Sequence, residues 1–364
     1  RLARRCLELV RDSLGPEGLT ASRAPCRRRQ LIPAFSLHWI LMVQDLWLWS
    51  GEAERVFLRT CLGGVDAVLS YFRSRLTADG FVGRVDEWAW VDWVPGWPHG
   101  VSPAAAAGEG STYLTGLLIL ALDAGATLHR ELGIAAEAQR WEALAARLRT
   151  TLRTKAWSAA QGLFLEGPGR ADPPTQHTQA LALLAGAAEG STRARVAARL
   201  VEDETLVPMS LFQRFYLARA LEAAGRYEAF FPKVLAPWRS VLDLGVTTWL
   251  EAADPSRSDC HAWASWMIHD FFACLLGARP EAPGWTRIRI QPAVTAVGSA
   301  KGSFGTPAGR LAVEWKTLAD GGIELSVEAP AGVPVKVVLP DGVRFFPNGG
   351  ALAVTTAAAV MAPG

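Results

Sequence analysis

Residues 83–100 combine side-chain types that could bind a sugar. Four tryptophans and three carboxylates lie there in a run broken by Pro and Gly. A buried carboxylate without a partner is costly, so the run is better explained by a ligand than by a core. Carboxylates accept hydrogen bonds from vicinal hydroxyls, and indoles cover the apolar faces of a sugar ring. The run therefore predicts a sugar-binding loop. The alternative is a loop ordered by local packing and surface ion pairs. The predicted sugar contacts are Asp86, Glu87, Trp88, Trp90, Asp92 and Trp93.

A second segment, residues 244–266, places one carboxylate in an irregular connection between two helices. Glu251 follows Trp249 closely, and a Glu in such surroundings can have its pKa set by burial, as a general base requires. We expect the next helix to begin at His261, with Ser258 or Asp259 as its N-cap. His261 would then orient a substrate hydroxyl. A surface carboxylate and a structural histidine are the alternatives.

The elements that must position these residues are mainly helices. Apolar residues recur with helical spacing in ten segments, joined by loops that are alternately short and long. Such hairpins favour an (α/α)6 toroid, which needs about twelve helices, so about one hairpin is expected upstream of residue 1. The expected helices lie near 2–14, 36–50, 54–76, 111–132, 135–154, 176–188, 192–202, 209–225, 227–243 and 261–277.

After Gly284 the pattern changes to short alternating runs typical of strands. They cover residues 286–290, 310–315, 323–327 and 335–339, and turn signals such as Asp320-Gly321-Gly322 and Pro340-Asp341-Gly342 separate them. The sequence therefore predicts a mainly α protein with a barrel over 1–282, N-terminally incomplete, and a small antiparallel β-sandwich over 283–364.

Composition limits the classes of partner. The 37 Lys and Arg against 35 Asp and Glu leave a formal charge of +2, which gives no reason to expect nucleic acid or an anionic membrane. Apolar runs such as 117–122 are far shorter than the roughly 20 residues of a membrane span. Five cysteines without CxxC spacing indicate neither a disulfide framework nor a zinc site. The 15 tryptophans against 4 tyrosines agree with a neutral sugar ligand, although large helical cores also use tryptophan.

Five motifs, in this order, resemble glycoside hydrolase family 78, the α-L-rhamnosidases. They are Glu87 with Trp90-Val91-Asp92-Trp93, Ser111-Thr112-Tyr113, Gln176-His177-Thr178-Gln179, Thr247-Thr248-Trp249-Leu250-Glu251 and Ser258-Asp259-Cys260-His261-Ala262-Trp263. The stretches 277–285 and 305–309 resemble that family's passage into its terminal sandwich. The resemblance covers essentially the whole chain.

The resemblance implies a six-hairpin barrel that removes terminal α-L-rhamnose by inverting hydrolysis. Glu251 would be the general base, and His261, Trp249 and the tryptophans of the first loop would contact rhamnose. The family's general acid lies on a segment resembling Asp-Cys-Pro-x-Arg-x-Glu, which is absent here, so the acid is expected upstream of residue 1.

The implied partners are rhamnose-containing glycosides or oligosaccharides, with no cofactor and no metal, and a homodimer stays open. Two alternatives also stay open: a six-hairpin glycosidase of other sugar specificity, and a non-catalytic carbohydrate-binding relative. Neither the aglycone nor the cellular compartment can be inferred from this sequence.

Overall fold

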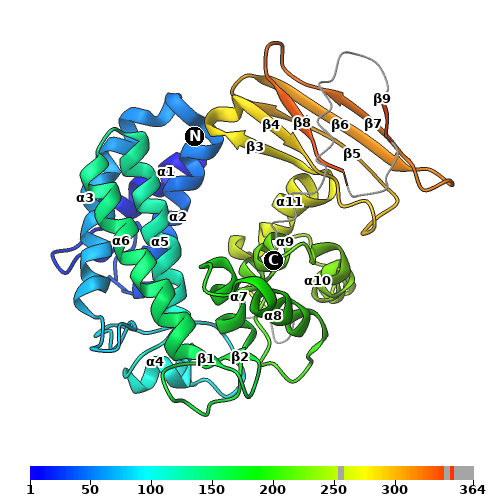
Figure 1. Ribbon diagram of the computed structural model, residues 1–364. Helices are drawn as coiled ribbons and strands as arrows, with labels where there is room; N and C mark the ends of the chain where they lie inside the picture. The colour runs from blue at the N-terminus through cyan, green and yellow to red at the C-terminus, as the bar shows by residue number, and fades with distance from the viewer. Residues whose placement is uncertain (253–257, 340–344, 348–364) are drawn as a thin grey trace. The chain divides into compact units, whose positions relative to one another are not determined.

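The computed structural model describes residues 1–252, 258–339 and 345–347. The chain forms two compact units, Arg1–Leu46 with Arg55–Arg226, and Trp47–Glu54 with Tyr227–Gly364. The first unit is helical, and the second contains the last helices and two larger sheets (Figure 1). The predicted domain boundary between residues 282 and 283 was based on the change of sequence pattern from helix to strand, and it stays a prediction. Residues 253–257, the turn at Pro340-Asp341-Gly342 and residues 348–364 of the expected sandwich lie outside the described residues.

Helices occupy the expected segments before residue 226. They are α1 (Leu2–Asp12), α2 (Pro33–Ser50), α3 (Arg55–Ser74), α4 (Pro103–Ala107), α5 (Thr112–Glu131), α6 (Ala135–Thr151), α7 (Gln176–Leu184), α8 (Gly190–Glu202) and α9 (Arg214–Ala223). Sequence periodicity missed α4, because its five residues are too few to show a helical repeat. Its start is nevertheless encoded locally: the Ser102 hydroxyl accepts a hydrogen bond from the Ala105 amide, and Pro103 occupies the first turn.

Helix α5 forms the centre of the first unit. It packs against α6, α7 and α3, and Figure 1 shows α3, α5 and α6 side by side. Glycines permit two of these close approaches: a Cβ at Gly116 would lie 2.9 Å from the Leu181 Cβ, and one at Gly125 would lie 2.9 Å from Leu69. Among the described residues, α5 alone is long and apolar enough to cross a membrane. Since 83% of its apolar window is buried, it has the surroundings of a core helix.

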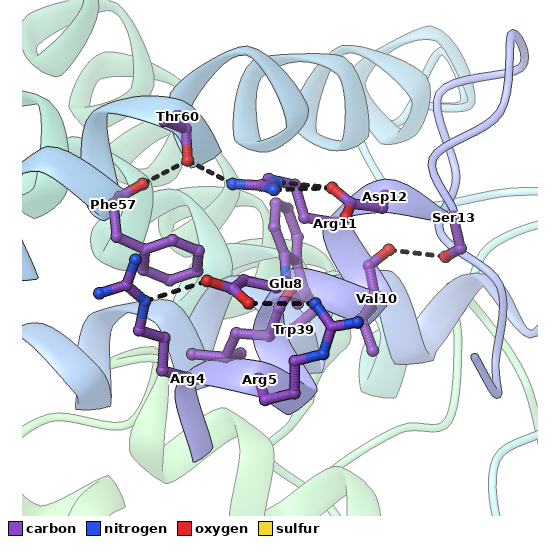
Figure 2. A network of polar contacts seen from close by, with 11 residues as sticks. Arg4, Arg5, Glu8, Val10, Arg11, Asp12, Ser13, Trp39, Phe57 and Thr60 are labelled. Atoms are coloured by element: carbon purple, nitrogen blue, oxygen red, sulfur yellow. Dashed lines mark hydrogen bonds and ion pairs between the residues drawn. The ribbon is translucent and has the colours of Figure 1, made fainter. Parts of the chain in front are cut away.

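Helix α1 is fastened to α2 and α3 by polar contacts, which Figure 2 shows. The Trp39 indole N–H donates to the Leu7 carbonyl at 3.3 Å. The Arg11 guanidinium donates to the Thr60 hydroxyl, and its carbon lies 5.5 Å from the centre of the Phe57 ring. Leu7 is the buried residue of α1, so the apolar contact that this residue makes is supplemented by the polar contacts of charged side chains on the same helix.

In the second unit, α10 (Tyr227–Asp243) matches its expected range. The expected helix 261–277 is divided into a 3-10 turn (Ala262–Ser265), a short α11 (Trp266–Asp270) and a π-helical turn (Phe271–Leu275). The expected ends at residues 261 and 277 therefore hold only approximately.

The strands of the second unit form two sheets around one apolar core. One sheet has the order β3 (Ala278–Ala282), β4 (Arg287–Ile290), β8 (Val335–Val337); the other has β5 (Ser299–Thr306), β6 (Gly309–Thr317), β7 (Ile323–Glu328), β9 (Phe345–Pro347). Ile288 of one sheet and Trp315 and Leu325 of the other belong to the same buried cluster, as in a sandwich.

The four expected runs are strands β4, β6, β7 and β8, whereas β3, β5 and β9 were not predicted. The pairs β3–β4, β5–β6 and β6–β7 are antiparallel, as expected, but β4 pairs with β8 and β7 with β9 in parallel. The antiparallel sandwich expected from sequence therefore also contains two parallel pairings. Turn signals predict hairpins between neighbouring runs, and they carry no information on strands that return from far along the chain.

Candidate functional site

The tryptophan loop, residues 83–111, connects the end of α3 to the start of α5. Its two ends meet, because the Ser111 amide donates to the Val82 carbonyl at 2.9 Å. The Ser111 side chain then caps α5 by accepting from the Leu114 amide. The two ends of the loop are therefore held together at the N-terminus of α5.

Asp92 is the anchor of this loop. Its side chain is completely buried, and its Oδ2 accepts from the His177 Nε2 at 2.7 Å and the Ser210 amide at 2.8 Å. The Oδ1 accepts from the Trp93 amide at 2.8 Å and from the Ser210 hydroxyl. His177 lies in the first turn of α7, and Ser210 precedes α9. These bonds give Asp92 a positioning role; its predicted contact with substrate stays a prediction.

The tryptophans of the loop have different surroundings. Trp90 is 2% exposed and packs edge-on against Phe35, with ring centres 5.4 Å apart. Trp93 is half-buried and packs edge-on against Trp90 at 5.8 Å. The half-buried Trp88 donates its indole N–H to the His99 carbonyl at 2.9 Å. Trp90 is therefore part of the local core, while Trp88 and Trp93 keep partly accessible rings.

Three of the predicted residues line a common cavity of about 580 Å³. Asp86, Glu87 and Trp88 form part of its wall, and the Asp86 carboxylate accepts from Arg75 at 2.6 Å. The remaining lining residues, which sequence reasoning did not select, are Arg84, Val85, Ala89, His99, Val101, Ala105 and Ala106. Trp90, Asp92 and Trp93 do not line it. The structure thus divides the predicted loop residues into a cavity group and an internal group.

A second buried carboxylate, Glu166, was not predicted as a site residue. It is 6% exposed and accepts from the Thr178 hydroxyl at 2.6 Å and the Thr175 amide at 2.9 Å. Thr175 also caps α7, two residues before His177. Burial raises the pKa of Glu166 to about 7, against the opposing effect of these hydrogen bonds. Glu166 therefore holds the helix start that presents His177 to Asp92.

In the second unit, Glu251 lies where two short extended segments face each other. The Glu251 amide donates to the Ser258 carbonyl at 2.9 Å, and the His261 amide donates to the Trp249 carbonyl at 2.7 Å. The Glu251 side chain is only 2% exposed, and its Oε2 lies 3.9 Å from the His261 Nδ1. The Trp249 ring packs edge-on against Trp238 of α10 at 5.3 Å. The structure brings Glu251, Trp249 and His261 together.

The expected start of the following helix needs correction. His261 is extended, with φ of −129°, and the helical turn begins at Ala262 without a side-chain cap. The expected caps, Ser258 and Asp259, therefore do not perform that function. The backbone bond from His261 to Trp249 explains the difference, because it keeps residue 261 in an extended conformation.

The described part of the chain contains no group of three His, Cys, Asp or Glu side chains that could hold a metal ion. None of the five cysteines forms a disulfide bond within the described part of the chain.

Comparisons with known proteins identify the family of this chain. Residues 1–275 match the bacterial alpha-L-rhamnosidase six-hairpin glycosidase domain, and residues 277–345 match the bacterial alpha-L-rhamnosidase C-terminal domain. An alpha-L-rhamnosidase of Alteromonas sp. (strain LOR) is 30% identical over 140 residues, covering 34% of this chain and 15% of that protein.

Solved structures show the same fold. A glycoside hydrolase family 78 rhamnosidase of Bacillus sp. GL1 has a TM-score of 0.86 at 25% identity, covering 95% of this chain and 37% of its own. The Streptomyces avermitilis alpha-L-rhamnosidase complexed with L-rhamnose has a TM-score of 0.72 at 20% identity, covering 92% and 32%. The chain spans 37% and 32% of the length of these two structures. It belongs to the bacterial alpha-L-rhamnosidase family, with that family's six-hairpin glycosidase domain and C-terminal domain.

Proposed function

We propose that this chain carries the hydrolytic site of an α-L-rhamnosidase, which removes terminal α-L-rhamnose from rhamnosides or oligosaccharides. The observation that carries the proposal is the buried carboxylate of Glu251, 2% exposed and beside the His261 imidazole. A carboxylate shielded from bulk water can act as a general base on one bound water molecule. Family membership and a relative complexed with L-rhamnose support the choice of sugar.

In this proposal the reaction is an inverting hydrolysis. Glu251 takes a proton from a water molecule, whose oxygen attacks the anomeric carbon of rhamnose. The bond from that carbon to the glycosidic oxygen breaks, and a general acid gives the departing oxygen a proton. His261 positions a sugar hydroxyl, and Trp249 contacts a face of the same sugar ring. Neither a redox cofactor nor a metal is needed for these steps.

The test uses nitrophenyl α-L-rhamnoside, because the nitrophenolate departs with little help from an acid. The rate then depends mainly on the base. Glu251→Gln keeps the shape of the side chain but cannot accept the proton of water, so kcat should fall by at least about a thousandfold. Binding of L-rhamnose, measured by calorimetry, should stay within about tenfold. The control is Glu281→Gln, which removes a surface carboxylate 3.4 Å from Lys336 in the same unit and should leave kcat unchanged.

Four outcomes would change the proposal. Equal rates for Glu251→Gln and the parent protein would exclude Glu251 as the base. Faster hydrolysis of nitrophenyl glucoside or glucuronide would assign a different sugar to the site. Binding of rhamnose without turnover of the nitrophenyl substrate would indicate a carbohydrate-binding protein. An initial product of retained configuration, detected by NMR, would contradict the inverting mechanism.

A further inference from the structure

The connection between α1 and α2, residues 13–32, contains the densest positive charge of the chain. Four arginines, Arg23 and Arg27-Arg28-Arg29, lie within seven positions. Residues 1–30 contain eight arginines against three acidic residues, whereas the rest of the chain has 29 Lys and Arg against 32 Asp and Glu. The small net charge of +2 is therefore the sum of a positive N-terminal part and a slightly negative remainder.

These four arginines lie on a closed loop, residues 22–30, which we call the arginine loop. The Ser22 amide donates to the Gln30 carbonyl at 2.9 Å, and the Ser22 hydroxyl donates to the Gln30 side-chain oxygen at 3.0 Å. Just before the loop, the buried Thr20 donates its amide hydrogen to the Ser36 hydroxyl at 3.0 Å. The base of the arginine loop is thus fixed on the core of the first unit, and the closure keeps the arginines close together.

The arginines of this loop face solvent. Each of the four is exposed. Arg29 forms an ion pair with Glu17, in which its Nη1 lies 3.3 Å from the Glu17 Oε2. Among the described residues, no carboxylate pairs with Arg23, Arg27 or Arg28. Three positive charges on a closed loop therefore lack a counter-charge in the described part of the protein.

The chemistry of the loop selects one kind of anion. A planar guanidinium donates two parallel hydrogen bonds to a carboxylate. One exposed ion pair contributes little, but a polymer with a carboxylate on each unit contacts several arginines at once. Residues 13–32 contain no Phe, Trp or Tyr on which nucleic acid bases could stack. None of the large apolar side chains that are exposed lies in these residues, so the connection has nothing to insert into a membrane.

We propose that the arginine loop binds an acidic polysaccharide whose uronic acid units carry carboxylates. Arg23, Arg27 and Arg28 donate hydrogen bonds to carboxylates of different units, and the contact between Ser22 and Gln30 keeps the three guanidinium groups together. The choice of a polysaccharide over another polyanion rests on the proposed rhamnosidase function, because such a polymer can also carry the rhamnose that is removed. The loop then holds the protein on a polymeric substrate, wherever along the polymer the rhamnose is cleaved.

The experiment measures binding of polygalacturonate, a uronic acid polymer without rhamnose, by titration calorimetry. The affinity should fall about tenfold between about 50 and 200 mM NaCl, because each arginine contact releases counterions from the polymer. Methyl-esterified polygalacturonate has the same backbone without the charge and should not bind. Replacing Arg23, Arg27 and Arg28 together by Gln should weaken binding of polygalacturonate at least about tenfold. Hydrolysis of nitrophenyl α-L-rhamnoside, which is neutral, should be unchanged by this variant.

The matched control replaces Arg73, Arg147 and Arg195 together by Gln. These arginines are exposed on α3, α6 and α8 of the same unit, so this variant loses the same total charge but keeps the arginine loop. Its affinity for polygalacturonate should stay within about twofold of the parent value. Equal weakening by the two triple variants overturns the proposal, because net charge and not the loop would then account for the binding.

Other polyanions and the hydrolysis assay give the remaining outcomes. Tighter binding of a single-stranded oligonucleotide, or of phosphatidylserine vesicles, through the same three arginines overturns the assignment to uronic acids. A protein that hydrolyses nitrophenyl rhamnoside but does not bind polygalacturonate refutes the role of the loop alone. A protein that binds polygalacturonate through the loop but does not hydrolyse the nitrophenyl substrate supports the role of the loop and refutes the proposed function.

Discussion

Asp92 and Glu87 are both carboxylates of one loop, yet their surroundings give them different capacities. The Asp92 oxygens are occupied by His177, Ser210 and the Trp93 amide, and no part of the side chain reaches solvent. Glu87 is exposed on a cavity. Residue type and sequence spacing predicted the same role, contact with a sugar, for both carboxylates. Only the partners brought from α7 and from the start of α9 distinguish an anchor from a ligand contact.

The anchor role of Asp92 can be tested by Asp92→Asn. The amide group keeps the size of the side chain but presents N–H to donors, so buried hydrogen bonds are lost. We expect the free energy of unfolding, measured with urea, to fall by about 3 kcal/mol. Asp86→Asn is the control, because this exposed carboxylate has a surface ion pair with Arg75. A loss no larger than that of the control would show that Asp92 does not anchor the loop.

Glu166 predicts a pH dependence of stability. Its folded pKa of about 7 lies above the ordinary value of 4.5, so the protonated form is favoured by folding. The stability it contributes is complete below about pH 4.5 and is lost as pH rises through about 7. Relative to Glu166→Gln, the parent protein should lose about 2–3 kcal/mol of unfolding free energy between pH 5 and pH 8.

The comparison with Glu166→Gln isolates this group. Burial lowers the pKa of His38 to about 4, so His38 has the opposite pH dependence, but it is present in both proteins and cancels. The measurement is urea unfolding of both proteins at several pH values. A difference between them that stays constant from pH 5 to pH 8 would refute the raised pKa of Glu166.

At the scale of the element, replacing a helical glycine by alanine should change the unfolding free energy in opposite directions at an open site in α3 and at a closely packed site in α5. An alanine at either helical site gains helix propensity, about 0.5–1 kcal/mol. At Gly63 of α3 nothing lies within 4 Å of the new Cβ, so Gly63→Ala should raise the unfolding free energy by that amount. At Gly116 the new Cβ would meet the Leu181 Cβ at 2.9 Å, and overpacking should reverse the sign, for a net loss of about 1 kcal/mol. Stabilisation by both substitutions would show that α5 and α7 have room to separate.

Elements with many residues were predictable from sequence, and short or distant pairings were not. Helices such as α5 and α10 carry several turns of apolar repeat, so periodicity located them. Helix α4 has five residues, and β9 has three and pairs with β7 in parallel, so neither leaves a local pattern. In the candidate site, the proximity of Trp249, Glu251 and His261 was predictable because the three residues are close in sequence. His177, Ser210 and Glu166 were missed as partners because their importance depends on contacts between loops far apart in sequence.

At the scale of the whole molecule, the predicted sugar contacts are distributed over both compact units. Trp88 and Trp93 belong to the first unit, and Glu251 and His261 to the second. A ligand that binds only the folded state stabilises whatever part of the protein must be folded to bind it. Thermal unfolding therefore tests, independently of catalysis, which of the two units binds the sugar.

The proposed base, Glu251, lies in the second unit, so the expected result is that L-rhamnose raises that unit's unfolding transition in a calorimetric scan. At about 100 times its dissociation constant, the sugar should add about 2.7 kcal/mol to the unfolding free energy. Gly116 lies in the first unit, so Gly116→Ala should lower the unfolding temperature of that unit. Where two unfolding transitions are resolved, this shift identifies which of them belongs to the first unit. D-glucose at the same concentration is the control and should shift neither. If rhamnose raises only the transition that Gly116→Ala lowers, Glu251 takes no part in binding the sugar. The base of the proposed hydrolysis would then have to be sought among carboxylates of the first unit.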